Sequence, residues 1–313
     1  MTSNVRLIYN PHKLIASITF SDQMSLQYAI QTTLAYHDIF GYPLTVEEIH
    51  RYLIKKSTST SRVEDTLGHL LEKKLVGMVS KYYFLKGRSK IVSIRIKRKD
   101  YSKAKMRKAK LFGVLLKIIP SVKLAAISGA LSMDNSRKND DIDLVIITSK
   151  NLLWSTRFLA NLFLLLFKRD PAGQKISDRA CLNMFLDESA LSISDRNIYT
   201  AHEICQMRVL WDREGTYRKF LRANSWIKDY LPNWQLEKIT SSKSQVPSHK
   251  SFQFITNKFE LITERVLRSF QLSYMKSKIT TERISPTQLF FHPKDTQKQV
   301  LSEYQNRLNK LEI

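Results

Sequence analysis

Two aspartates, Asp141 and Asp143, stand just before the apolar run LVIIT and are the residues of this chain best suited to chemistry. Side chains of a β-strand alternate between its two faces, so a strand here places both carboxylates on one face and Ile142 on the other. Parallel carboxylates beside an apolar strand repel each other and require a cation. Because hard divalent ions take oxygen ligands, the pair predicts a metal site, with Mg²⁺ as the first choice and Mn²⁺ as the second.

A glycine turn precedes this pair. Residues 125–127 predict a short apolar strand that ends at Ser128 and Gly129, where the missing side chain lets the backbone approach a ligand closely. A helix that begins near Leu131 would point its free N–H groups at a phosphate. Asp141 follows Gly129 by 12 positions, which leaves room for one short helix and a polar loop.

Together these features resemble the signature of the nucleotidyltransferase superfamily that includes DNA polymerase beta. That signature is an apolar residue, Gly-Ser or Gly-Gly, about a dozen residues, and then Asp-apolar-Asp-apolar. The resemblance implies an α+β fold with a small mixed sheet and helices, and a metal ion held by Asp141 and Asp143. It also implies that a nucleoside triphosphate binds at the glycine turn, whose residues are Ser128, Gly129, Ala130 and Ser132.

The chain departs from the family pattern at two points. Ala130 occupies the position of a serine that helps to hold the phosphates, and the nearby Ser128 and Ser132 do not match that position. The family also uses a third carboxylate from a later strand, and the predicted strand 179–186 carries Asn183 in its middle. An amide cannot remove a proton. Asp187 is the alternative third acid, although it lies about 13 Å along the strand from Asn183.

These observations leave three hypotheses of function. The leading one is a metal-dependent nucleotidyltransferase that transfers a nucleoside monophosphate from a nucleoside triphosphate to an unidentified acceptor hydroxyl. The alternative is a degenerate site, with Ala130 and Asn183 as its signs, that binds nucleotide or nucleic acid as a regulatory module. The weakest is a DNA-binding transcription factor.

The N-terminal part predicts a winged helix. A helix begins at Leu26 and stops before Gly41, and the pairs Thr45/Glu48 and Ser61/Glu64 predict two capping boxes that open two more helices. A hairpin turning at residues 80–81 follows. Acidic residues near the start of the third helix, Glu64 and Asp65, would repel DNA phosphates, which favours a scaffolding or docking role.

Charge is the unusual feature of the composition. The 313 residues carry 51 Lys and Arg against 28 Asp and Glu, a formal net charge of +23, which favours anionic partners. Residues 86–110 hold 12 basic residues and one acid, and they predict either a groove for a nucleic-acid backbone or a solvated linker helix. Two cysteines exclude a disulfide framework and indicate a reducing cytoplasm.

The remaining segments predict helices. The longest apolar run, residues 152–167, is too short to span a bilayer and predicts a core helix, so no membrane partner is expected. Residues 197–209 predict another helix, in which the adjacent His202 and Glu203 face different directions and favour structural roles. An amphipathic helix through Phe252, a break at FFHP that contains His292, and a final helix complete the chain.

The predicted organisation is an arm (1–24), a winged helix (25–90), a basic linker helix (91–120), a nucleotidyltransferase-like domain (121–235) and a helical C-terminal region (236–313). The oligomeric state is not predicted.

Overall fold

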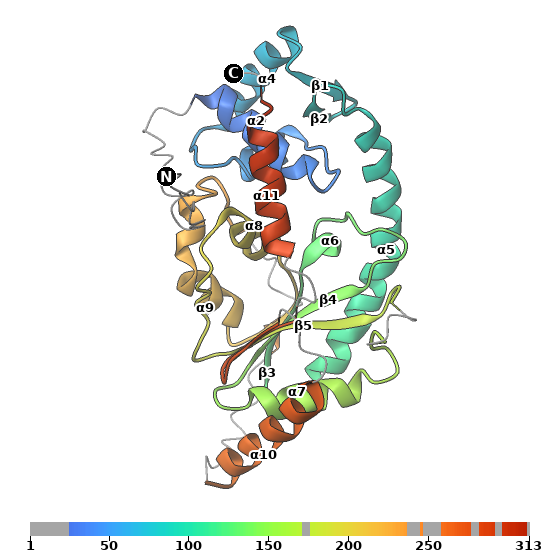
Figure 1. The fold of residues 1–313 in the computed structure, drawn as a ribbon, viewed down its shortest axis with the longest axis vertical. Coiled ribbons are helices and arrows are strands. Elements are labelled where there is room, and N and C mark those ends of the chain that lie inside the picture. The colour runs from blue at the N-terminus through green and yellow to red at the C-terminus, as the bar shows by residue number, and fades with distance from the viewer. Residues whose placement is uncertain are drawn as a thin grey trace, which may run out of the picture.

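The computed structural model describes residues 25–170, 176–236, 245–246, 258–276, 282–291 and 296–311. The fold is α+β, as predicted: a mixed sheet of seven strands with helices on both faces, and a separate two-stranded hairpin (Figure 1). The arm at 1–24, most of the linker at 238–250, Phe252 and His292 lie outside the described residues. None of the described helices is long and apolar enough to cross a membrane.

The N-terminal module has the predicted three helices and hairpin. Its elements are α2 (Leu26–Asp38), α3 (Val46–Arg51), α4 (Thr60–Glu72), β1 (Val76–Val79) and β2 (Tyr82–Leu85). The Thr45/Glu48 capping box is confirmed, with Thr45 Oγ1 accepting from the Glu48 N–H at 3.3 Å and Glu48 Oε2 accepting from the Thr45 N–H at 2.9 Å. The second predicted box is wrong because the cap of α4 is Ser59, two residues before the predicted Ser61, and the helix begins at Thr60.

Helix α5 (Lys90–Lys117) joins the two halves of the molecule along one side (Figure 1). The first turns of this helix are anchored to the N-terminal module. Arg95 makes two bonds of 2.7 Å to the Glu48 carboxylate, and its guanidinium lies 4.0 Å from the Tyr42 ring centroid. Half of the 12 basic residues in the 86–110 segment are bonded within the chain: Arg88, Arg95, Arg98, Lys103, Lys105 and Lys108.

The sheet runs in the order β7-β6-β3-β4-β5-β9-β8. Its central strands are β3 (Val122–Ile127), β4 (Ile142–Thr148) and β5 (Ala180–Asp187), with β4 antiparallel to β3 and parallel to β5. The parallel pair requires a crossover, and α7 (Leu153–Phe163) supplies it. Alternate residues of β4 enter different cores: Leu144 and Ile146 pack with α5 and α7, while Val145 and Ile147 pack with α8 (Ile198–Gln206) and α9 (Thr216–Ala223).

Two predictions for the region after β5 are wrong. Helix α8 ends at Gln206, and the predicted helical residue Val209 lies in β6 (Arg208–Arg213), because Met207 turns to extended backbone and β6 pairs with the edge of β3. The predicted break at FFHP begins inside β9 (Gln288–Phe290), which pairs with β5. The C-terminal region is therefore not purely helical. Its other elements are β7 (Gln245–Val246), α10 (Lys258–Met275), β8 (Arg283–Ile284) and α11 (Thr296–Leu308), and a 3-10 turn (Ser225–Asp229) precedes them.

Candidate metal centre

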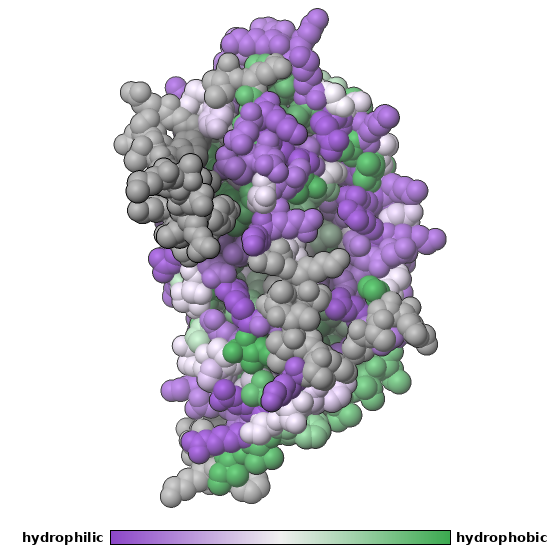
Figure 2. All heavy atoms as spheres, viewed as in Figure 1, coloured by the Kyte–Doolittle hydropathy of each residue, from purple (hydrophilic) through white to green (hydrophobic). Residues whose placement is uncertain are grey.

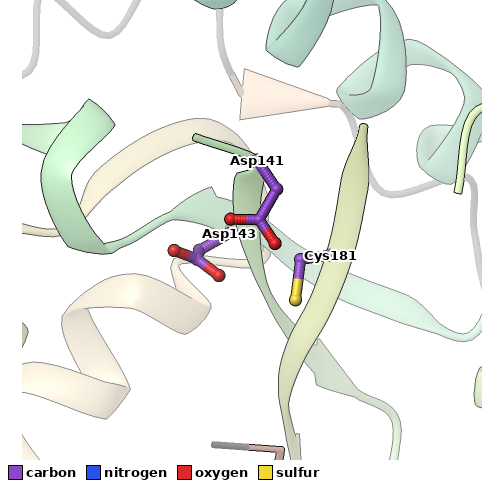
Figure 3. A group of neighbouring side chains, drawn as sticks. All are labelled: Asp141, Asp143 and Cys181. Carbon is purple, nitrogen blue, oxygen red and sulfur yellow. The ribbon is translucent and has the colours of Figure 1, made fainter. Parts of the chain in front are cut away.

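The two aspartates lie where the sequence predicts, at the start of β4. Asp141 immediately precedes the strand and Asp143 is its second residue, and both carboxylates project from the same side (Figure 3). A bond of 2.8 Å from Arg169 Nη1 to Asp141 Oδ2 holds the first carboxylate. The second is fixed through its backbone, because the Ser128 N–H donates to the Asp143 carbonyl at 3.1 Å. These contacts orient the pair towards one point in space.

Cys181 completes a group of possible metal ligands with this pair. It is the register partner of Asp143 on β5, and one ligand atom from each of Asp141, Asp143 and Cys181 lies within 4.8 Å of the others (Figure 3). Burial and the nearby Asp143 raise the pKa of the Cys181 thiol, so the thiol is protonated at neutral pH. A protonated thiol is a poor ligand, which leaves the two carboxylates as the donors that suit a hard ion.

The two residues predicted for the third acid lie in different places. Asn183 is buried and lines a cavity beside Asp143. Its backbone carbonyl accepts the Phe291 N–H at 2.8 Å. Asp187 lies at the opposite end of β5, in register with Thr148, and its carboxylate accepts the backbone N–H groups of Asn151 and Ser189 at 2.6 and 2.8 Å. Asp187 thus caps a turn away from the aspartate pair and is not part of this group.

The glycine turn faces Asp143. Gly129 has a φ of +61°, and a Cβ at this position would lie 2.8 Å from Asp143 Oδ2. The helix that follows, α6 (Gly129–Ser132), has only four residues. Ser132 Oγ donates to the Gly129 carbonyl at 2.7 Å, whereas the buried Ser128 Oγ has no hydrogen-bond partner among the described residues. Ala130 lines the same cavity as Asn183.

Replacement of Gly129 by alanine is expected to lower the free energy of unfolding by about 1–3 kcal/mol, because it combines a left-handed backbone with a collision against Asp143. Urea denaturation measures the change. Gly87→Ala is the matched control, since Gly87 also has a positive φ, +79°, but no atom lies within 4 Å of its Cβ position. If both variants lose the same free energy of unfolding, the close approach of the new Cβ to Asp143 does not destabilise the fold.

A cavity of about 340 Å³ opens beside the metal group and reaches the N-terminal module. One wall is aromatic and comes from α2 and the loop after it, with Tyr36, Phe40 and Tyr42. A second cavity of about 230 Å³ lies alongside and is lined by Ser128. The two cavities share three lining residues, Tyr199, Glu203 and Thr296.

Glu203 is the acid that sequence reasoning did not select. It projects from α8, its carboxylate accepts the Gly129 N–H, and burial raises its pKa to about 7. Burial, Asp141 and Glu203 likewise raise the pKa of Asp143 to about 7. The adjacent His202 faces elsewhere: its ring stacks on Tyr36 at 4.0 Å and its Nδ1 bonds the Ile198 carbonyl. The predicted divergence of the two neighbours is confirmed, and only the packing of α8 on the sheet reveals which of them reaches the site.

Lys105 holds the loop that leads into Asp141. Its side chain is 2% exposed, and its Nζ donates to the Asp140 carbonyl at 2.6 Å and to Asp178 Oδ1 at 2.6 Å. We expect Lys105→Met to lower the free energy of unfolding by about 2 kcal/mol, because the charged hydrogen bonds that the buried ammonium makes to Asp140 and Asp178 are lost. The matched control is Lys108→Met, which removes a 51% exposed partner of the same Asp178. That variant should change stability by less than about 0.5 kcal/mol. Similar losses of stability in the two variants, measured by urea denaturation, would contradict the role of Lys105 in holding this loop.

No family model, curated protein or solved structure matches this chain. The function therefore has to be argued from the site itself. The chain has an α+β fold with a mixed sheet, and it has a group of Asp141, Asp143 and Cys181 that could hold a metal ion.

Proposed function

We propose that this protein is a metal-dependent nucleotidyltransferase that moves a nucleoside monophosphate from a nucleoside triphosphate to an acceptor hydroxyl. The observation that carries the proposal is the side-by-side pair of Asp141 and Asp143, placed directly across from the Gly129 turn. This arrangement combines a site for a divalent cation with a backbone that a phosphate can approach.

Asp141 and Asp143 would hold Mg²⁺ or Mn²⁺. The donor set fits such an ion because its third member, the Cys181 thiol, stays protonated at neutral pH and leaves two carboxylates as donors. The ion, when bound, neutralises the triphosphate and polarises the reacting phosphorus. The Ser128 hydroxyl, buried without a partner among the described residues, would donate a hydrogen bond to a phosphate oxygen. The aromatic wall of Phe40 and Tyr42 would pack against the base.

Glu203 would act on the acceptor. With a pKa of about 7 and a place between the two cavities, its carboxylate suits a general base that takes the proton of the acceptor hydroxyl. The acceptor oxygen then bonds the α phosphorus as the bond to pyrophosphate breaks. The acceptor is unidentified. A nucleic acid fits the six basic residues of the 86–110 segment that are exposed and not placed in the internal bonds described above: Lys86, Lys90, Lys97, Lys99, Arg107 and Lys110.

A second candidate function is supported by one specific contact. The Glu203 carboxylate accepts the Gly129 N–H, the group that would otherwise meet a phosphate, and Cys181 takes the strand position opposite Asp143. Both features suit a degenerate fold that binds nucleotide or nucleic acid as a regulatory module without transfer.

Transfer of label separates the two functions. The protein is incubated with each of the common nucleoside triphosphates labelled at the α phosphate, with Mg²⁺ or Mn²⁺, and with RNA, DNA and protein acceptors. Label that enters an acceptor and is lost in Asp141→Ala supports the enzyme. Saturable nucleotide binding without transfer to any acceptor supports the regulatory module.

A further inference from the structure

Helix α7 and the turn after it expose a run of large apolar side chains. Leu165 and Leu166 are 65% and 81% exposed, and these values are unusual for leucine in a soluble domain. The whole run comprises Phe158, Leu162, Phe163, Leu165, Leu166 and Phe167. The core prediction for residues 152–167 therefore holds only for the side of the helix that faces the sheet, where Trp154 and Ala160 are buried.

Helix α10 extends this surface. One side of α10 is fixed to α7, since Gln271 Nε2 donates to the Trp154 carbonyl and Glu264 accepts the Ser155 N–H, both at 2.9 Å. Its other side presents an apolar residue at every fourth position, each between 57% and 64% exposed: Ile262, Val266, Phe270 and Tyr274. Residues four apart lie on one helix face, so this stripe is continuous.

The C-terminal half of α5 adds both apolar and basic side chains to this surface. Leu111, Val114 and Ile118 are exposed on α5, and the exposed Lys110 and Lys117 alternate with them. We call the exposed apolar residues of the C-terminal half of α5, of α7 with the turn after it, and of α10 the apolar face. Figure 2 shows hydrophobic surface along the lower edge of the molecule, where Figure 1 places α7 and α10.

The positive charge of the protein indicates which kind of partner binds the apolar face. The segments 101–133 and 149–169, which supply the C-terminal half of α5 and the whole of α7, contain no acidic residue, and the whole chain carries +23. A second copy would bring the same charge and be repelled, whereas an anionic surface is attracted. We propose that the apolar face docks on a membrane that contains anionic phospholipid, with the apolar side chains at the acyl boundary and the lysines at the headgroups.

The docked orientation leaves the candidate metal centre free. The side chain of Asp143 lies on the same face of β4 as Val145 and Ile147, which pack with α8. Helices α5, α7 and α10 pack on the opposite face of the sheet, where Leu144 and Ile146 lie. The site therefore faces away from the lipid. This proposal does not depend on the nucleotidyltransferase function. The apolar face gives no membrane-spanning run in the sequence, because its residues come from three separate helices.

Vesicle co-sedimentation tests the proposal with the full chain. We expect sedimentation with vesicles of phosphatidylglycerol and phosphatidylcholine, weaker binding at high salt, and little binding to phosphatidylcholine alone. Leu166→Ser/Phe270→Ser should lower the affinity at least about tenfold, since two exposed apolar side chains no longer enter the lipid. The matched control is Met78→Ser/Ile96→Ser, which changes two exposed apolar residues elsewhere and should bind as the wild type does.

A second pair of variants tests the charge. Lys110→Glu/Lys117→Glu should weaken binding about tenfold or more, while Lys73→Glu/Lys97→Glu, with the same net charge, should weaken it less. All four variants change exposed positions, so circular dichroism should match the wild type. Equal binding by all variants, or no binding by the wild type, would overturn the proposal. A dimer in analytical ultracentrifugation that Leu166→Ser/Phe270→Ser abolishes, without vesicle binding, would assign the face to self-association instead.

Discussion

Replacement of Glu203 by glutamine is expected to lower nucleotidyl transfer by about 10²–10⁴-fold while Mn²⁺ still binds. Glutamine keeps the size of the side chain and its contact with the Gly129 N–H, but it cannot take a proton from the acceptor. The metal-binding oxygens of Asp141 and Asp143 are kept, and the pKa of Asp143 falls because the negative charge of Glu203 is removed, which favours the ionised form that binds the cation. The loss should therefore appear in kcat rather than in the affinity for the ion or the nucleotide.

Two measurements check this prediction: the rate of label transfer at saturating nucleotide and acceptor, and Mn²⁺ affinity by calorimetry. Glu214→Gln is the matched control, because Glu214 is paired with Lys123 at 2.8 Å and lines neither cavity. If Glu203→Gln loses Mn²⁺ affinity as far as it loses rate, Glu203 is a metal ligand and not a base. An unchanged rate would remove Glu203 from the mechanism.

The pH dependence of transfer follows from the same carboxylate. With a pKa of about 7, Glu203 in the wild type becomes a competent base as the pH rises through 7, so kcat should increase over that interval. In Glu203→Gln this rise should be absent from the residual rate. Because binding of a cation also favours the ionised form of nearby acids, the profile is best recorded at saturating metal.

The aspartate pair could be predicted because its geometry is local. The alternation of a strand is enough to put Asp141 and Asp143 on one face, and the positive φ of Gly129 agrees with the reason for a glycine there. The winged-helix elements are equally local, since turn and capping residues mark them. These parts of the fold are set by residues that lie within about one helical turn of each other in the sequence.

The third position of the site could not be predicted because it depends on strand register. Counting along β5 favours its central polar residue, Asn183, but the pairing of β4 with β5 sets Cys181 beside Asp143 and skips Asn183 at the register shift between Leu144 and Val145. Glu203 comes from α8, which is distant along the chain and reaches the site only by packing on the face of β4 that carries Val145 and Ile147. Short strands such as β9 were not predicted for a related reason. The three residues of β9 are extended because they pair with β5, and they show no strand pattern in the sequence.

Replacement of Asp143 by asparagine is expected to stabilise the metal-free protein at pH 8 by about 4 kcal/mol, although it should abolish cation binding. Burial, Asp141 and Glu203 raise the pKa of Asp143 from 3.8 to about 7. The folded protein therefore holds a proton that the unfolded chain releases near pH 4. The stability tied to this proton is complete below pH 4 and is lost as the pH rises through 7.

Asparagine cannot ionise, so it removes this loss. The variant and the wild type should have similar free energies of unfolding near pH 4, and the variant should become the more stable as the pH approaches 8. Urea denaturation in the presence of a chelator measures the difference. Asp187→Asn is a control, because Asp187 is an acid of the same sheet that caps a turn and lies away from the pair. Its variant should be less stable than the wild type at pH 8.

Divalent cation should reverse the order of stability. An ion that binds the ionised pair stabilises only the folded wild type, by an amount that grows with its concentration above Kd. With Mn²⁺ present at pH 8, the wild type should therefore recover the stability that it lacks without metal, while Asp143→Asn should not respond. A wild-type protein that is already more stable than Asp143→Asn at pH 8 without metal would show that Arg169 and the surrounding dipoles neutralise the carboxylates. In that case the aspartate pair would not need a cation, and the main support for the metal centre would be lost.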